Sequence, residues 1–220
     1  MKQTMVLCAV VWFGMGTVSS VMAYPTIQLE EGLYQSASGG EFKGTVLSGD
    51  IPGNPVGSTW QTFCVELDEY VSLPSTYYAV VNTAAVLGGV GGPEPDPLSP
   101  MTAWLYDQFC KGTLPGYDYS TVSGRKNSAA ALQDAIWYIE EELTSLPSGL
   151  ATDFYNQANA SGWTDIGDIR VLNLYGDPSL GAPAQDVLIS TCVVPAPGAL
   201  LLAGMGTALV GAVRRRFSRA

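Results

Sequence analysis

The 220-residue sequence contains no histidine. Without an imidazole side chain, the chain cannot form a Ser-His-Asp triad, a Cys-His dyad or a zinc site with histidine ligands. The sequence also lacks internal repeats, and no glycine-rich loop lies between a strand and a helix to bind nucleotide phosphates. We therefore exclude histidine-dependent hydrolases and nucleotide-binding enzymes, and we expect no cofactor and no metal site.

Basic residues are scarce in the long central part of the chain. Residues 24–192 contain all 20 aspartates and glutamates of the sequence and only five lysines and arginines. Their net charge is therefore −15. Such a charge repels a phosphate backbone, so no nucleic-acid binding is expected. The carboxylates supply candidates for the paired acid and base of a glycoside hydrolase, but no motif distinguishes any two of them.

The N-terminal segment has the pattern of a secretory signal peptide. A single charge at Lys2 precedes an apolar stretch over residues 5–18, and small residues precede Tyr24. A retained membrane anchor is the alternative, but the apolar stretch is shorter than the roughly 20 residues that a membrane crossing needs. We expect residues 1–23 to be removed as a signal peptide and the mature chain to be exported.

The C-terminal segment, residues 193–220, combines an apolar stretch with a basic end. Residues 198–213 are 16 small and apolar residues. As a helix they would extend about 24 Å, against the ~30 Å of a hydrocarbon core, so they can span a membrane marginally. The basic end, residues 214–219, would stay in the cytoplasm. We predict a single C-terminal transmembrane helix, with residues 24–192 outside the cell.

This segment resembles the PEP-CTERM sorting signal, in which a Val-Pro-Glu-Pro-like box precedes a short transmembrane helix and an arginine cluster. The box corresponds to residues 194–197, with Ala196 where the family usually has glutamate. The matching positions are Pro195, Ala196, Pro197, Arg214, Arg215 and Arg216. The resemblance implies processing by an exosortase-type membrane protease, with a transient stay in the inner membrane before transfer to the cell surface or extracellular matrix. An unprocessed tail anchor is the alternative.

The pattern of residues 24–192 is strands, then helices, then strands. Alternating side chains and Gly39-Gly40 predict a hairpin over residues 33–47. Four further strands are predicted at residues 60–67, 77–81, 169–174 and 186–190. We expect an α+β fold, a β-sandwich or barrel-like core with a helical insertion.

Two helices are predicted within the insertion. Ser99 is a candidate N-cap before Pro100, and the first helix runs through Phe109. A polar stretch that we expect to be a loop, residues 112–126, follows. The second helix begins near residues 127–128, has apolar residues at spacings of three and four, and ends before the turn at 147–149.

The mature chain keeps an odd number of cysteines, because Cys8 leaves with the signal peptide. The three that remain are Cys64, Cys110 and Cys192. In an exported chain, at least one sulfur must therefore have a fate other than an internal disulfide. Cys64 lies in the predicted strand 60–67, on the face opposite Phe63.

Two motifs resemble those of the thioester domains of bacterial surface adhesins. They are Phe-Cys-Val at residues 63–65 and Leu-Gln-Asp-Ala-Ile-Trp at residues 132–137. The resemblance covers residues 62–142 and implies a thioester between Cys64 and Gln133. The Cys64 thiolate would displace ammonia from the Gln133 amide, and the acyl group would later pass to an amine or hydroxyl of a surface or matrix molecule. Such a module performs one acyl transfer and is not a turnover enzyme.

A thioester between Cys64 and Gln133 would give roles to the residues around it. Trp137 and Phe63 are candidates to shield it from water, although Trp137 equally suits a core aromatic residue. Cys110 and Cys192 would be free to form a disulfide, whereas pairing of Cys64 with Cys110 would abolish the thioester. Four side chains near in sequence can assist proton transfer: Thr62, Glu66, Asp134 and Tyr138.

A different class of function needs no thioester. In that alternative, Cys64 is an inert buried residue, and the chain is a non-covalent structural or carbohydrate-binding protein of the extracellular matrix. Exposed aromatic rings could stack on sugars, and the candidates are Trp60, Tyr77, Tyr78 and Trp163.

Overall fold

The computed structural model describes residues 23–36, 39–87 and 95–192. Apart from Ala23, the predicted signal peptide lies outside these residues, and so does the whole predicted sorting tail. Within the described part of the chain, no helix is both long and apolar enough to cross a membrane.

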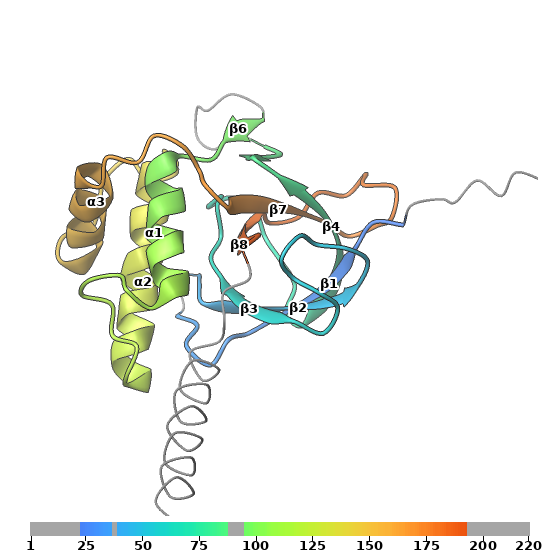
Figure 1. The fold of residues 1–220 in the computed structure, drawn as a ribbon, viewed down its shortest axis with the longest axis horizontal. Coiled ribbons are helices and arrows are strands. Elements are labelled where there is room, and N and C mark those ends of the chain that lie inside the picture. Colours follow the sequence, from blue (N-terminus) through green and yellow to red (C-terminus); the bar gives the residue numbers. More distant parts are fainter. Residues whose placement is uncertain (1–22, 37–38, 88–94, 193–220) are drawn as a thin grey trace, which may run out of the picture.

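Six strands form one antiparallel sheet that is nearly closed (Figure 1). In sheet order they are β3 (Thr59–Thr62), β2 (Phe42–Ser48), β1 (Thr26–Glu30), β4 (Ser75–Asn82), β7 (Ile169–Tyr175) and β8 (Val187–Ser190). The chain just after β3 meets β8, where the N–H of Leu188 donates to the carbonyl of Phe63 at 3.1 Å. The N–H of Val65 likewise donates to the carbonyl of Asp186 at 3.0 Å. We predicted either a β-sandwich or a barrel-like core, and the structure shows the barrel-like one.

Three helices pack together on one side of this sheet (Figure 1). They are α1 (Pro100–Lys111), α2 (Val122–Ile139) and α3 (Leu150–Ala160). Between β4 and α1 lies a small two-stranded pair, β5 (Ala84–Ala85) with β6 (Asp96–Pro97). The helices come between β6 and β7 in the chain, so the predicted helical insertion is confirmed. The predicted cap is confirmed too, because Ser99 Oγ accepts a hydrogen bond from the N–H of Met101 at 3.2 Å.

Successive side chains after β3 enter two different hydrophobic clusters. Phe63 and Val65 pack with the helices, whereas Cys64 packs with residues inside the sheet. Strand alternation predicts this separation, because neighbouring side chains point to opposite faces. Trp137 of α2 also belongs to the cluster inside the sheet. Helix α2 therefore contributes a side chain to the same cluster as Cys64.

Several predicted elements were wrong. The hairpin partner of β2 is β1, and residues 33–36 form no strand beyond one isolated bridge between Ser36 and Gly39. Helix α2 begins at Val122, inside the predicted loop, because Thr121 Oγ1 caps it by accepting the N–H of Gly124 at 3.1 Å. It also ends at Ile139, well before the predicted turn. Helix α3 was not predicted.

Candidate functional site: a paired cysteine and glutamine

Cys64 lies at the seam where the sheet closes. Its backbone forms an antiparallel bridge with Val187 of β8. Its side chain is 4% exposed and belongs to the cluster inside the sheet. Because the backbone is paired here and the side-chain direction follows from strand alternation, the position of the sulfur is narrowly determined.

Gln133 of α2 lies directly against Cys64, although 69 residues separate the two in the sequence. Its Oε1 accepts a hydrogen bond from the backbone N–H of Cys64 at 2.9 Å. Its Nε2 donates to the backbone carbonyl of Cys64, also at 2.9 Å. Gln133 is 0% exposed. Both ends of the carboxamide are thus bonded to one residue, which holds the amide carbon beside the cysteine.

Two glycines allow the backbone to approach this pair closely. Gly39 has a φ of +111° and Gly40 a φ of +21°, both in the region that favours glycine. A Cβ on Gly39 would lie 3.3 Å from Gln133 Oε1, and one on Gly40 would lie 2.2 Å from a ring carbon of Phe63. A side chain at Gly40 would therefore displace Phe63.

A buried ion pair fastens this glycine segment to α2. Glu41 follows Gly40 and is 0% exposed. Its carboxylate accepts hydrogen bonds from Nε of Arg125 at 2.9 Å, from Nη2 of Arg125, and from the Tyr117 hydroxyl at 2.8 Å. The Arg125 guanidinium also lies 4.0 Å from the centroid of the Tyr34 ring. Because Arg125 belongs to the helix that carries Gln133, the ion pair aligns both sides of the site.

The environment of Cys64 disfavours a free thiolate. Burial raises the pKa of the thiol well above its ordinary range, a backbone hydrogen bond from Gly40 lowers it in part, and the Glu69 carboxylate raises it further. An uncharged sulfur, in a thiol or in a thioester, escapes this penalty. The site therefore disfavours only the ionised form.

A pocket of about 530 Å³ opens onto Cys64. Its walls include Tyr70, which is 79% exposed, and Trp137, which is 8% exposed. Two carboxyl side chains, Glu69 and Asp134, also line it. Trp137 thus shares this pocket with Cys64, and its shielding role stays a prediction. Phe63, the other predicted shield, packs against Gly40 on the helix side.

The remaining candidates for proton transfer lie in different surroundings. Thr62 donates its hydroxyl hydrogen to the carbonyl of Leu188 at 2.5 Å, and Tyr138 packs edge-on against Tyr155 at 5.3 Å between ring centroids. Glu66 is 2% exposed. None of these three lines the pocket at Cys64, so of the four residues singled out from the sequence only Asp134 does.

A group of carboxyl side chains, Glu66, Glu69, Glu142 and Asp186, lies beside the seam. Only Glu66 among them was singled out from the sequence. Burial is the main cause that raises the pKa of Glu66 to about 9, and the next is the hydrogen bond that protonated Glu66 donates to the Glu142 carboxylate. Burial, then the charge of Asp186, raises the pKa of Glu69 to about 7. Burial also raises the pKa of Asp186 to about 6. These residues come from separate segments, so no local motif marks them. Among the described residues, no group of three or more acidic or cysteine side chains is arranged to hold a metal ion.

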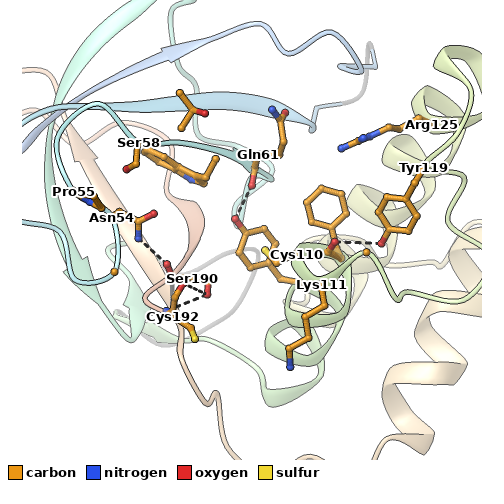
Figure 2. A pocket seen from close by; sticks show the side chains of 16 residues that line it. Asn54, Pro55, Ser58, Gln61, Cys110, Lys111, Tyr119, Arg125, Ser190 and Cys192 are labelled. Carbon is orange, nitrogen blue, oxygen red and sulfur yellow. Dashed lines mark hydrogen bonds between the residues drawn. The ribbon is translucent and has the colours of Figure 1, made fainter. Parts of the chain in front are cut away.

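The other two cysteines lie at a second pocket, of about 850 Å³, between the sheet and α1 (Figure 2). Cys110 of α1 and Cys192 after β8 both line it, and their sulfurs are not bonded. The disulfide between them stays a prediction. Cys64 lines the first pocket and not this one, which disfavours the competing pairing of Cys64 with Cys110.

The aromatic residues of the carbohydrate-binding alternative do not gather on an exposed face. Tyr77 is 6% exposed, and Tyr78 is half-buried. Trp60 is half-buried and donates its indole N–H to the carbonyl of Leu188 at 3.3 Å. Trp163 packs against the cluster beneath the helices. Their positions indicate packing roles more than a sugar-stacking platform.

No family model and no curated protein matches the sequence. Among solved structures, the chain is similar to the N-terminal thioester domain of a surface protein from Clostridium perfringens, with a TM-score of 0.47 and 12% sequence identity. The alignment covers 76% of this chain and 98% of that one.

Proposed function

We propose that Cys64 and Gln133 form an internal thioester through which the exported protein attaches covalently to an amine or hydroxyl of a surface or matrix molecule. The observation that carries this proposal is the reciprocal pair of 2.9 Å hydrogen bonds between the Gln133 carboxamide and the Cys64 backbone. They bring together the two residue types that the chemistry needs, from two distant segments of the chain. Burial of both supports the same conclusion.

Thioester formation follows from the contacts of the carboxamide. The Cys64 sulfur attacks the amide carbon of Gln133, and Oε1 takes the negative charge of the tetrahedral intermediate. The Cys64 N–H already donates to that oxygen at 2.9 Å and can stabilise the charge. The carbon–nitrogen bond then breaks, and Nε2 leaves as ammonia with the former thiol proton.

Attachment reverses the order of bond changes at the same carbon. An amine nitrogen bonds to the acyl carbon, the carbon–sulfur bond breaks, and the proton released by the amine ends on the Cys64 sulfur. Gln133 becomes the amide link to the target, so each molecule reacts once and no turnover enzyme results. Until a nucleophile arrives, burial of the acyl group limits hydrolysis by water.

The two chain ends complete the proposal. Residues 1–23 would direct export, and residues 193–220 would hold the protein in the inner membrane until an exosortase-type protease transfers it to the surface or matrix. Membrane contact is then transient. Support for this part comes from the sequence motifs alone.

Methylamine labelling tests the attachment reaction. The purified protein is expected to gain about 31 Da on reaction of its thioester with methylamine, with the label on Gln133 and a newly alkylatable thiol at Cys64. Peptide mapping locates both changes. In Cys64→Ala no activated acyl group exists, so Gln133 should remain unlabelled. Equal labelling of the two proteins, or labelling spread over other glutamines, would refute the assignment.

A further inference from the structure

The pocket that opens onto Cys64 contains two carboxyl side chains, which differ in how they are held. Glu69 lies five residues beyond Cys64, and its Oε2 accepts a hydrogen bond from the backbone N–H of Asp186 at 3.2 Å. Asp134 lies on α2, next to Gln133. Both are only part-buried, so each can meet a molecule that enters the pocket.

Acyl transfer at this site requires that a proton move from the attacking nucleophile to the departing sulfur. An attacking amine must lose a proton as its nitrogen bonds to carbon, and the departing sulfur must gain one. Burial raises the pKa of the Cys64 thiol far above neutrality, so an ionised sulfur is a poor product inside the pocket. The chain has no histidine to carry the proton. A carboxylate in the pocket is the remaining kind of group that can do so near neutral pH.

We propose that Glu69 carries this proton: its carboxylate takes a proton from the incoming amine or hydroxyl as the new bond to the Gln133 carbon forms, and returns it to the Cys64 sulfur as the carbon–sulfur bond breaks. The inference rests on the proposed thioester. The proton leaves the nucleophile and ends on sulfur, so Glu69 finishes the reaction as it began and no further reactant is needed.

Three observations select Glu69 among the acidic groups at the seam. It lines the pocket with Cys64, whereas Glu66 and Glu142 do not. After burial and the opposing hydrogen bond from Gly40, its charge is the next cause that shifts the pKa of the Cys64 thiol, and it raises that pKa. Its pKa of about 7, raised first by burial and then by Asp186, lets it both accept and release a proton at neutral pH. Asp134, Tyr70 and Cys64 share its pocket, and charge coupling links it to Cys64 and to four further groups, Glu66, Glu142, Tyr175 and Asp186.

The test measures the rate at which the thioester of the exported protein reacts with O-methylhydroxylamine, an amine that is uncharged across neutral pH. In the wild type, the rate should rise with pH up to about 7 and then level off, because only the ionised Glu69 accepts a proton. In Glu69→Gln, the rate on the plateau should fall about 100-fold and the inflection should vanish. Asp134→Asn removes the other carboxyl of the pocket and separates its contribution from that of Glu69: the inflection should remain, because Glu69 still titrates in that variant.

Each other outcome has a defined meaning. Glu69 has no such role if Glu69→Gln retains its thioester and reacts at the wild-type rate, or if Asp134→Asn loses the inflection instead. Should Glu69→Gln fail to fold or to form the bond, Glu69→Asp replaces it: a slower reaction that keeps an inflection supports the proposal, and an unchanged rate overturns it. Failure of the thioester itself is visible earlier, because the wild type would then show no ammonia loss before any amine is added.

Discussion

Gln133→Glu is expected to abolish methylamine capture completely. A carboxylate has no ammonia to release, so the Cys64 thiol cannot form the thioester from it and no activated acyl group arises. The substitution also places an oxygen where Nε2 donates to the Cys64 carbonyl. Because wild-type Gln133 already loses Nε2 when the thioester forms, the effect on stability is compared between Cys64→Ala, which keeps the carboxamide, and the double variant Cys64→Ala/Gln133→Glu. With this donor lost at a side chain that is 0% exposed, the free energy of unfolding of the double variant should be lower by about 1–3 kcal/mol. Mass spectrometry after methylamine treatment measures the first effect, and urea denaturation measures the second.

Gln157→Glu provides the matched control for this substitution. Gln157 lies on α3 and donates its Nε2–H to a backbone carbonyl, that of Pro115 at 3.2 Å, but has no cysteine partner. The same change of amide to carboxylate there should leave methylamine capture intact. Methylamine found at residue 133 of the Gln133→Glu protein would contradict the assigned chemistry.

Arg125→Ala should lower the free energy of unfolding by about 3–5 kcal/mol, because it leaves the buried carboxylate of Glu41 without its cation. Glu41 is 0% exposed, and the Tyr117 hydroxyl would remain as its side-chain donor. Since Glu41 follows Gly40, the backbone beside Gln133 should loosen as well. We therefore expect less thioester per molecule, measured by the fraction of protein that has lost ammonia.

An exposed ion pair supplies the comparison. Lys43 contacts Glu30 at 2.6 Å, with 41% and 33% of the two side chains exposed. Lys43→Ala should cost only about 0–1 kcal/mol, because solvent screens such pairs. If Arg125→Ala and Lys43→Ala lower stability equally in urea denaturation, the buried pair does not hold the site together.

Local patterns predicted the elements whose stability comes from their own residues. Ser99 and Pro100 mark the start of α1 because capping is a local interaction. The alternation around Cys64 predicted its face because pleating has a period of two. The apolar residues Ala151, Phe154 and Ala158 recur at spacings of three and four, so the same criterion applied to residues 150–160 would have found α3.

Other features depend on contacts between distant segments. The start of α2 includes Arg125, which is tied to Glu41, 84 residues away in the sequence. The need for glycine at position 40 arises from the Phe63 ring, which no local pattern around Gly40 reveals. Glu69 likewise acquires its surroundings from Asp186, just before β8, and from Glu142, in the chain after α2. Cys64 and Gln133 were singled out because their motifs resemble a known family, whereas the residues that surround them have no motif of their own.

Intact-mass measurement of the reduced protein tests the central proposal most directly. The thioester predicts a mass about 17 Da below that calculated from the sequence, the loss of one ammonia, because reduction removes any disulfide as an explanation. Cys64→Ala should show its full calculated mass under the same conditions. A wild-type protein at its full calculated mass, differing from Cys64→Ala by the side-chain difference alone, would contradict the thioester between Cys64 and Gln133.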